Sequence, residues 1–488
     1  STPSNSSAAS DVYKRQKHEV LYEVAKLAYA GRLEEERDSL PYKMVPGPQP
    51  AFRCCIYRER EVIRQRIRLA EGKAPGAEDD GNIVQVINSA CEGCPISRYV
   101  VTDNCQKCMG KACQAACRFG AISMGRDKSY IDPSKCKECG QCAKACPYNA
   151  IADLVRPCMK SCPVDAISVA DNGTGIAVIN QDKCIQCGSC VHKCPFGAIG
   201  SKTFIVDIIK KMRSDIKVFA MLAPATIGQF GADITMASWR TALKKIGFYD
   251  VVDVSLGADM TAMNEAKEWI EAKEKGEKKT TSCCPAFKNY IEKHFPTLKD
   301  AISETVSPMC AASRYIKEKF PGAVTVFIGP CIAKKAESMS GEKDTADYAL
   351  TYGEIRAMLR AKGVKLEPEE DTDDQGSIYG KKFANAGGVT AAVLESMKEL
   401  GCTGDVSVCK CSGITECKKA LTLMKVGRLP EDFIEGMVCE GGCVGGPSRH
   451  RDPNLAMRDR NAALAKSSDI LIKDNLDKQN AETVDMIR

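Results

Sequence analysis

The chain of 488 residues carries a formal net charge of +6, from 69 basic and 63 acidic residues that are mixed along its length. This mixture argues against nucleic acid as a partner, because nucleic-acid binding usually requires a concentrated basic stripe. The 28 cysteines stand beside four histidines, and no apolar run reaches the roughly 18 residues of a membrane span. So long a chain does not need disulfide staples, and it lacks the charged and then apolar start of a signal peptide. We therefore expect reduced thiols that bind soft metal, in a cytoplasmic protein with no membrane partner.

Composition divides the chain into five stretches. Residues 1–17 begin with the small polar run STPSNSSAAS, and we expect them to be disordered. Residues 18–81 should form helices and a linker, because HEVLYEVAKLAYAG and EREVIRQRIRLAEG repeat apolar residues at helix spacing. Residues 82–202 are dense in cysteine. Residues 203–450 alternate strand-like runs such as VFAMLAP with amphipathic segments, which is typical of an α/β domain, and the polar tail 451–488 is given no function.

Two cysteine runs in the dense stretch follow the bacterial ferredoxin pattern C-x2-C-x2-C-x3-C-P. They are CKECGQCAKACP, which starts at Cys136, and CIQCGSCVHKCP, which starts at Cys184. In this pattern three thiolates bind one 4Fe-4S cluster and the fourth reaches a second cluster. A zinc site needs two separated pairs that close a tetrahedron, so the pattern favours iron-sulfur over zinc. We expect residues 82–202 to form an α+β ferredoxin-like region.

Two less regular runs complete the count. CQKCMGKACQAAC stretches one spacing, and CMKSCPVDAI resembles the end of a run whose first pair is CEGC. Crossing between runs then divides 16 cysteines into four 4Fe-4S clusters with none left over. The first two clusters take Cys105, Cys108, Cys113 and Cys146, and then Cys117, Cys136, Cys139 and Cys142. The other two take Cys162, Cys184, Cys187 and Cys190, and then Cys91, Cys94, Cys158 and Cys194.

Such a relay needs an electron donor or acceptor. Between Asp103 and Lys160 there are ten Lys and Arg against five Asp and Glu. This local excess could steer an acidic electron carrier such as ferredoxin, or it could be an ordinary solvated surface.

Three segments of the α/β stretch carry five further cysteines: TSCCPAF with Cys283 and Cys284, GPCIAKKAE with Cys331, and EGMVCEGGCVGG with Cys439 and Cys443. Four thiolates from three loops could hold another cubane, which alone would suggest only one more relay cluster. The segments also closely resemble the three signature motifs of the FeFe hydrogenases, in family order and at family-like intervals. The resemblance extends from about residue 82 to residue 450, and the pattern is more similar to the group B branch.

This resemblance implies a two-lobed α/β domain with an H-cluster, which is a 4Fe-4S cubane bridged to a diiron unit with carbon monoxide, cyanide and azadithiolate ligands. The cubane ligands would be Cys284, Cys331, Cys439 and Cys443, and Cys443 would also bridge to the diiron unit. Residues expected to contact the diiron unit are Lys334, Ser307, Pro308 and Met437.

The resemblance also implies a proton relay. Cys283 would be a free thiol that passes protons to the bridge amine, and Glu268, Ser303 and Glu265 would connect it with solvent. On sequence alone the two glutamates, three apart, could simply lie on a solvated helix face. An arginine often found one turn beyond the inner glutamate is replaced by Ala272, which leaves the outer end of the path open.

Other positions depart from the family pattern. Gly329 replaces methionine and is expected to open space beside the diiron unit. Phe287 replaces tryptophan, and Ala225 removes a hydrogen-bonding side chain that is common there. We therefore expect the redox potential and the turnover to differ from those of the best-known members.

Three functions compete. A hydrogenase would interconvert protons, electrons and H2, with ferredoxin and the hydrogenase maturation proteins as partners. A hydrogen sensor would use the same cofactor, although the sequence shows no sensory or kinase-like domain. An iron-sulfur assembly or electron-transfer relative would lack the diiron unit, and would be expected to lack Cys283 and Lys334 as well. Four further cysteines, Cys402, Cys409, Cys411 and Cys417, follow no ligand pattern and are expected to pack, with an extra metal site as the alternative.

Overall fold

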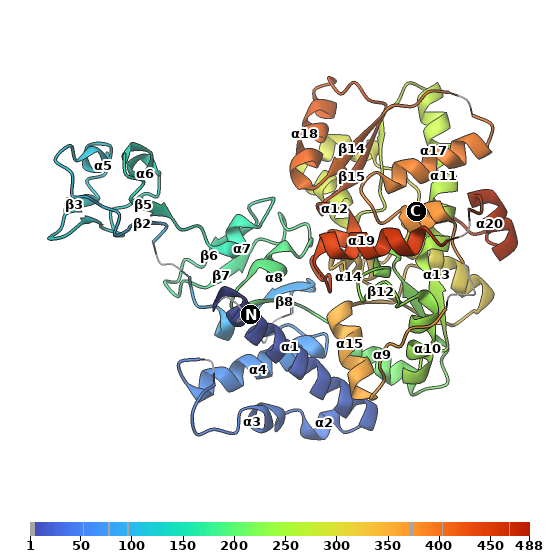
Figure 1. Cartoon of the computed structure of the whole chain (residues 1–488), viewed down its shortest axis with the longest axis horizontal. Coiled ribbons are helices and arrows are strands. Elements are labelled where there is room, and N and C mark those ends of the chain that lie inside the picture. The colour runs from blue at the N-terminus through green and yellow to red at the C-terminus, as the bar shows by residue number, and fades with distance from the viewer. Residues whose placement is uncertain are drawn as a thin grey trace.

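The structure is a computed structural model that describes residues 5–51, 53–76, 79–94, 97–370, 375–402, 404–467 and 469–488, with side chains described from residue 14 onward. An N-terminal group of helices, a cysteine-rich region and a larger α/β region follow one another along the chain (Figure 1). No helix among the described residues is long and apolar enough to span a bilayer.

The N-terminal helices are α1 (Asn5–Ala30), α2 (Leu33–Glu36), α3 (Leu40–Met44) and α4 (Ile56–Ala70). Helix α1 already begins at Asn5, whereas residues 1–17 were expected to be disordered; residues 1–4 lie outside the described part. Ala8 and Ala9 are strong helix formers, and extending an existing helix costs much less than nucleating one.

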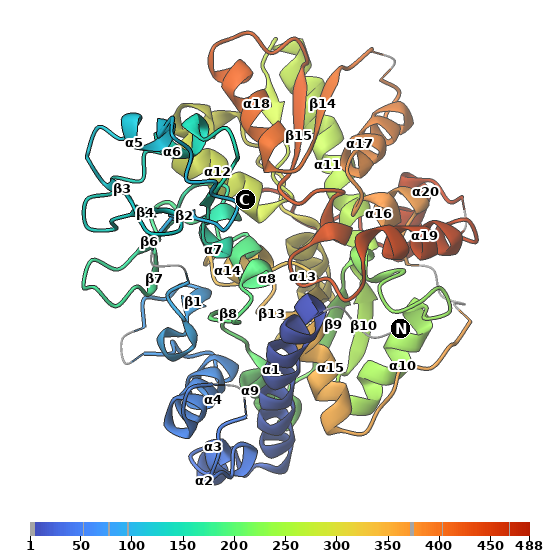
Figure 2. The same ribbon diagram turned by 60° about the vertical axis from the view of Figure 1, so that its left-hand side comes forward.

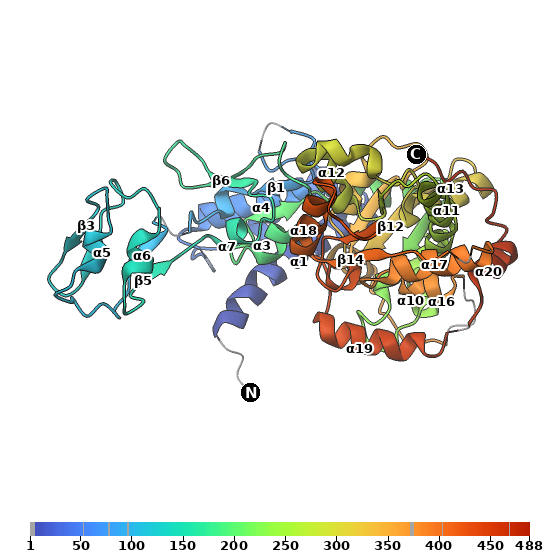
Figure 3. The same cartoon turned by 90° about the horizontal axis from the view of Figure 1, so that it is seen from above.

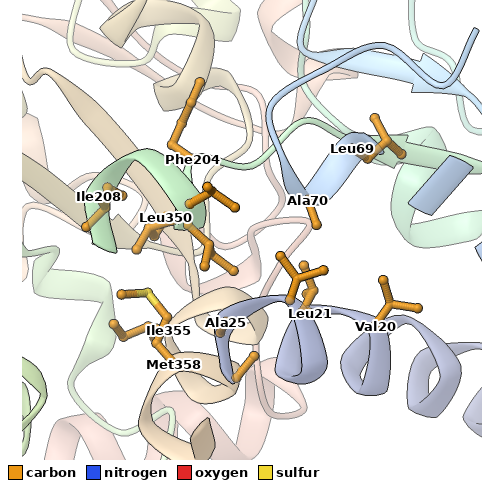
Figure 4. Close-up of a cluster of buried hydrophobic side chains, with 14 of the residues drawn as sticks. Val20, Leu21, Ala25, Leu69, Ala70, Phe204, Ile208, Leu350, Ile355 and Met358 are labelled. Carbon is orange, nitrogen blue, oxygen red and sulfur yellow. The ribbon is translucent and has the colours of Figure 1, made fainter. Parts of the chain in front are cut away.

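The N-terminal helices share one hydrophobic core with the α/β region. Helix α1 packs against α4, α9 (Ile205–Met212) and α15 (Tyr352–Ala361). Figure 4 shows the contact, where Ala25 of α1 lies near Ile355 and Met358 of α15 and Leu21 lies near Ala70 of α4. These side chains are buried, so the helices are an integral layer of the molecule.

The cysteine-rich region consists of two lobes, one inserted into the other. The outer lobe contains β2 (Tyr99–Val101), α5 (Ala112–Ala115), β3 (Ile122–Met124), β4 (Ser129–Ile131), α6 (Gln141–Ala145) and β5 (Ile151–Asp153). The inner lobe contains β1 (Val84–Val86), α7 (Pro157–Lys160), β6 (Ile167–Val169), β7 (Ala177–Ile179), α8 (Ser189–Lys193) and β8 (Ile199–Ser201). Strand β1 pairs with β8 across the whole insertion. The outer lobe projects away from the rest of the molecule (Figures 1 and 3).

The α/β region contains two parallel sheets. A four-stranded sheet has the order β10-β9-β12-β13, formed by β10 (Asp250–Asp253), β9 (Val218–Leu222), β12 (Val324–Gly329) and β13 (Tyr348–Thr351). A three-stranded sheet has the order β11-β15-β14, formed by β11 (Lys279–Thr280), β15 (Phe433–Met437) and β14 (Val408–Ser412). Figure 2 shows the two sheets at opposite ends of the region, which is the expected two-lobed α/β architecture.

Helices cover both sheets. They are α10 (Met236–Ile246), α11 (Val254–Glu274), α12 (Pro285–His294), α13 (Pro308–Lys319), α14 (Ala333–Ser338), α16 (Ile378–Lys382), α17 (Gly388–Glu399) and α18 (Ile414–Lys425). The long helix α11 packs against α13, α16 and α17, so it connects the two lobes. Strands β9 and β15 are buried at every residue, as expected for parallel strands covered on both faces.

The C-terminal segment, residues 451–488, is part of the same region. It forms α19 (Pro453–Leu464) and α20 (Ile472–Gln479), and α20 packs on α11 and α17. Ile472 and Leu476 join the hydrophobic core of the lobe. The sequence was too polar overall to reveal this, because only a few apolar positions of each short helix face the core.

Candidate functional site

The central cavity lies at the carboxyl ends of strands from both sheets, which is where open parallel sheets usually bind ligands. Strand β12 ends just before Cys331, and β15 ends just before Cys439. The cavity measures about 90 Å³, room for several water-sized groups. The predicted site residues that line it are Cys283, Cys284, Pro308, Cys331, Lys334, Met437, Cys439 and Cys443.

Two helices begin at the cavity wall. Cys284 is the N-cap residue of α12. Ser307 is the N-cap residue of α13, and its hydroxyl accepts a hydrogen bond from the backbone N–H of Cys310 at 3.4 Å. Both helices have proline at the first position, where a missing N–H costs nothing. Their N-terminal dipoles favour negative charge, so the wall suits thiolates and other anionic ligands.

The thiols around the cavity resist ionisation in the protein alone. Burial, followed by neighbouring cysteines, raises the pKa of Cys331 to about 11 and the pKa of Cys443 to about 12. The same causes, burial first, raise the pKa of Cys439 well above its usual value. Bound iron would supply the missing positive charge and deprotonate these thiols. The donor set therefore fits a thiolate-bound iron cluster.

Lys334 points into a polar corner of the cavity wall. Its ammonium donates to Ser307 Oγ at 2.8 Å and to the Cys283 carbonyl at 3.3 Å, and it pairs with Glu337 Oε2 at 2.6 Å. Burial has the largest single effect and lowers the pKa of Lys334, but the charge and the hydrogen bond of Glu337, together with Cys331 and Cys283, raise it by more in sum, so the net direction is upward. The amine is therefore held as a cation beside the expected diiron position.

The predicted proton-relay residues lie in one neighbourhood, and two of them, Ser303 and Glu268, are hydrogen-bonded to each other. Helix α11 buries Glu265 completely, and neither of its carboxyl oxygens has a hydrogen-bond partner among the described residues. Burial, and then the charge of Glu268, raises the pKa of Glu265 to about 8. Ser303 Oγ donates to Glu268 Oε2 at 2.6 Å. Glu265 also raises the pKa of Cys283, after the larger effect of burial.

Lys279 and Thr305 belong to the outer end of this group, and sequence analysis missed both. The Lys279 ammonium lies 3.6 Å from Glu268 Oε1, and Thr305 Oγ1 donates to Glu268 Oε2 at 3.1 Å. Lys279 therefore places a cation beside Glu268. Only its location, just upstream of the TSCC segment, hinted at this role.

The accessory cysteines gather as the crossing rule groups them. One small cavity is lined by Cys105, Cys108, Cys113 and Cys146. A second is lined by Cys117, Cys136, Cys139 and Cys142. A third is lined by Cys162, Cys184, Cys187 and Cys190. The fourth set also lies together. Burial raises the pKa of Cys158 to about 11, and Cys194, Cys94 and Cys91 lie close enough to raise it as well.

One cysteine connects the relay with the central cavity. Cys187 lines both the third accessory cavity and the central one. Next to it, Gly188 has φ of 77°, and a Cβ there would lie 2.5 Å from Ile332 Cδ1. Glycine thus lets the loop of the third cluster approach the loop that carries Cys331.

The departure at Gly329 does not open the space that we expected. A Cβ on Gly329 would lie 2.9 Å from Cε1 of Phe327, which itself lines the cavity. The phenylalanine ring fills the room that the missing side chain leaves. Phe287 is fully buried, and its ring leaves room only for glycine at position 436. Ala225 lines the cavity and brings no polar group to it.

The remaining thiols look structural. Cys310 is fully buried but does not line the cavity. Cys409 and Cys411 lie side by side on β14 with their sulfurs 3.9 Å apart, and the Cys417 thiol donates to the Met437 carbonyl at 3.7 Å. Across the described residues, no three His, Cys, Asp or Glu side chains converge on a single metal ion. Packing stays the expectation for these thiols, with an extra metal site as the alternative.

Known proteins share these features. Residues 216–447 match the family model described as iron only hydrogenase large subunit, C-terminal domain. Residues 129–152 and 156–198 match models of a 4Fe-4S binding domain and a 4Fe-4S dicluster domain. The chain is 31% identical to iron hydrogenase 1 of Clostridium pasteurianum, over 67% of this chain and 66% of that protein.

Two further relatives differ in role. The periplasmic (Fe) hydrogenase large subunit of Nitratidesulfovibrio vulgaris is 29% identical over 50% of this chain and 72% of its own length. The cytosolic Fe-S cluster assembly factor NAR1 of Meyerozyma guilliermondii is 27% identical over 33% of this chain and 32% of its own length. The chain thus spans about two thirds of the length of the two hydrogenases.

The fold and the cavity define an iron-sulfur protein in which ferredoxin-like lobes precede an α/β domain built around a thiol-lined cavity. The chain belongs to the iron-only hydrogenase family.

Proposed function

We propose that the chain is a hydrogenase that interconverts two protons and two electrons with H2. The observation that carries this proposal is the composition of one cavity wall. Four candidate cubane ligands share it with a fifth thiol, Cys283, and with a buried ammonium, Lys334. A simple relay cluster needs four thiolates and has no use for either of the other two groups.

The cofactor in this proposal is an H-cluster, with four accessory 4Fe-4S clusters in the lobes. Cys284, Cys331, Cys439 and Cys443 would hold the cubane, and Cys443 would also bridge to the diiron unit. Lys334, Ser307, Pro308 and Met437 would surround the diiron unit. When bound, the diiron unit supplies the metal centre at which protons and electrons combine.

The protein residues have separate tasks in this scheme. Lys334, fixed by Glu337 and Ser307, offers an ammonium to a cyanide ligand. Cys283 holds a proton at Sγ, because burial raises its pKa well above the usual value. Glu265 holds a second proton at its carboxyl group below pH of about 8, which suits a donor to Cys283. Ser303 donates a hydrogen bond to Glu268, which pairs with Lys279, and these residues would carry protons between Glu265 and the surface.

Electrons would take the opposite side of the cavity. Cys187 is shared between the third accessory cavity and the central one, which supports that cluster as the direct partner of the cubane. The basic outer lobe would receive a ferredoxin-type carrier, and the hydrogenase maturation proteins would supply the diiron unit. The cytoplasm is the location that we propose, since many reduced thiols must persist there until they bind iron.

Two alternative functions predict different experimental results. A hydrogen sensor would bind the same cofactor but turn over slowly. An assembly factor, as one relative is named, would hold a cubane without a diiron unit, and Cys283 and Lys334 together speak against this.

Infrared spectroscopy decides between these functions. Protein made together with the maturation enzymes should show bands of carbon monoxide and cyanide bound to iron, and should evolve H2 from a reduced low-potential donor. Iron-loaded protein without such bands would exclude the hydrogenase, and bands with negligible turnover would favour the sensor.

A further inference from the structure

Helix α19 carries a buried arginine beside the cavity. Arg460 is fully buried, and its guanidinium donates to the carbonyl oxygens of Pro224 and Lys381 and to Asn385 Oδ1, the last at 3.0 Å. All three acceptors are neutral groups. A buried cation is expensive unless opposite charge lies nearby, so this position requires an explanation beyond simple packing.

The three acceptors belong to two segments of the cavity wall, one with Pro224 and one with Lys381 and Asn385, and the second segment pairs with a third at Gly442. Pro224 itself lines the cavity, and Lys381 is the second-last residue of helix α16, which leads to the lining residues Phe383 and Ala384. Asn385 pairs with Gly442, which lines the cavity one residue before a candidate ligand.

The segment that contains Asn385 also contacts the loop of Cys443 through its backbone. The Cys443 backbone N–H donates to the Ala384 carbonyl at 2.8 Å. Ala384 directly precedes Asn385, whose side-chain oxygen accepts the hydrogen bond from Arg460. A planar guanidinium with five donors suits such a task, because it fixes several acceptors in one geometry.

Helix α19, which carries Arg460, packs closely against the backbone at Gly228. A Cβ on Gly228, which has φ of 82°, would lie 2.4 Å from the Ala456 carbonyl oxygen and 2.6 Å from the Arg460 nitrogen.

Burial lowers the pKa of Arg460 to about 10, and Tyr352, Asp253 and Cys443 act in the opposite direction. The side chain is therefore a cation at neutral pH.

We infer that Arg460 is a positioning residue, which ties two segments of the cavity wall together, supports a third through Asn385, and offsets the negative charge of a cluster bound at Cys443. The tie depends only on the fold. The charge role rests on the proposed function, because it requires a cluster at that cysteine.

The test uses the full chain loaded with iron-sulfur cubanes but made without the maturation enzymes. Arg460→Lys keeps the charge but loses the planar fork, and Arg460→Met loses both. Arg458→Met is the matched control, because Arg458 lies on the same helix with a side chain that is 69% exposed and pairs with Asp459. Each variant is compared with wild type at equal iron content.

Amide hydrogen exchange tests the tie. In both Arg460 variants, residues 222–229, 381–388 and 440–446 should exchange at least about tenfold faster, the effect of losing one charge-assisted hydrogen bond. Exchange in the outer lobe and throughout Arg458→Met should match wild type. Unchanged exchange in the three segments, or a uniform increase across the whole molecule, would overturn the tie.

The reduction potential of the catalytic-domain cubane tests the charge role. A redox titration followed by electron paramagnetic resonance should give a more negative potential for Arg460→Met and a potential near wild type for Arg460→Lys. An unchanged potential in Arg460→Met would overturn the charge role. A missing cubane signal in wild type would instead count against the proposed function, while hydrogen exchange would still decide the tie.

Discussion

Cys283 and Cys284 are neighbours in sequence with different surroundings. Cys284 begins helix α12 at the cavity wall, whereas Cys283 is buried near Glu265 on the side of the proton relay. A thiol of unperturbed pKa would exchange protons freely near neutral pH, and the sequence alone suggested such a group. Burial raises the pKa of Cys283 instead, so the thiol stays protonated until the site draws a proton from it.

Cys283→Ser separates catalysis from cofactor binding. The variant keeps nearly the same volume and all four candidate cubane ligands, so the complete cofactor should still assemble. Its H2 evolution should fall by at least about a hundredfold, because a serine hydroxyl is a far weaker proton donor than a thiol. Both proteins need equal iron content and equal infrared intensity. Turnover within a few-fold of wild type would leave Cys283 with only a packing role.

Glu265 makes stability depend on pH. Its pKa is about 8 in the folded chain, against an ordinary value of 4.5. Between these values the folded protein keeps a proton that the unfolded chain loses. Stability should therefore fall with rising pH, by at most about 1.4 kcal/mol per pH unit. Glu265→Gln removes this dependence, so its apparent Tm should gain on wild type from pH 5 to pH 8 under anaerobic conditions. Parallel curves would contradict the assignment.

Lys334 should matter for the diiron unit and not for the cubanes. Lys334→Ala removes the ammonium but ligates no iron, so infrared bands of carbon monoxide and cyanide should weaken severely at unchanged cubane content. The change also strands the buried Glu337 carboxylate. Lys334→Ala combined with Glu337→Gln therefore serves as the control for misfolding, and wild-type infrared intensity in either variant would refute the role.

At the scale of elements, the inserted outer lobe is the clearest separable unit. Strand β2 pairs with β5, and the Leu154 N–H donates to the Arg98 carbonyl at 2.6 Å, so the two ends of the lobe lie side by side. Segments with adjacent ends can often be removed or inserted without disturbing the host fold.

Replacing residues 98–154 with a short glycine-serine linker should therefore leave the rest of the protein folded. Iron content should fall by about eight atoms, the content of two cubanes. H2 oxidation with a small dye should persist, whereas reduction of ferredoxin should drop at least about tenfold because the basic docking surface is lost. Equal loss of both activities would mean that the lobe is required for the fold of the catalytic domain.

Sequence patterns predicted elements where one local rule decides the outcome. Continuous apolar character indicates the strands. Cysteine spacing indicates the ferredoxin runs and the separate pair of Cys91 and Cys94. Burial at Arg460 was harder to foresee, although Ala456, Arg460 and Leu464 repeat every four residues on one face of α19 and are all buried. Gly329 misled because space at a glycine depends on distant neighbours, here Phe327.

At the scale of the whole molecule, the proposed accessory clusters would carry electrons between the outer lobe and the central cavity. Fully matured protein should contain about 22 irons per chain, sixteen in accessory cubanes and six in the H-cluster. Iron analysis normalised to protein by amino-acid analysis measures this figure. A plateau near about 14 would mean two missing accessory clusters and would refute the pairing of Cys91 and Cys94 with the later run.

The nesting of one lobe within the other also fixes an order of events during synthesis. Cys91 and Cys94 emerge from the ribosome long before Cys158 and Cys194, and the entire outer lobe is made in between. At ordinary translation speeds the first pair waits roughly 5 to 20 s for its last partner. The outer lobe can take up iron during that interval, so the clusters farthest from the catalytic cavity are the first that the growing chain can complete.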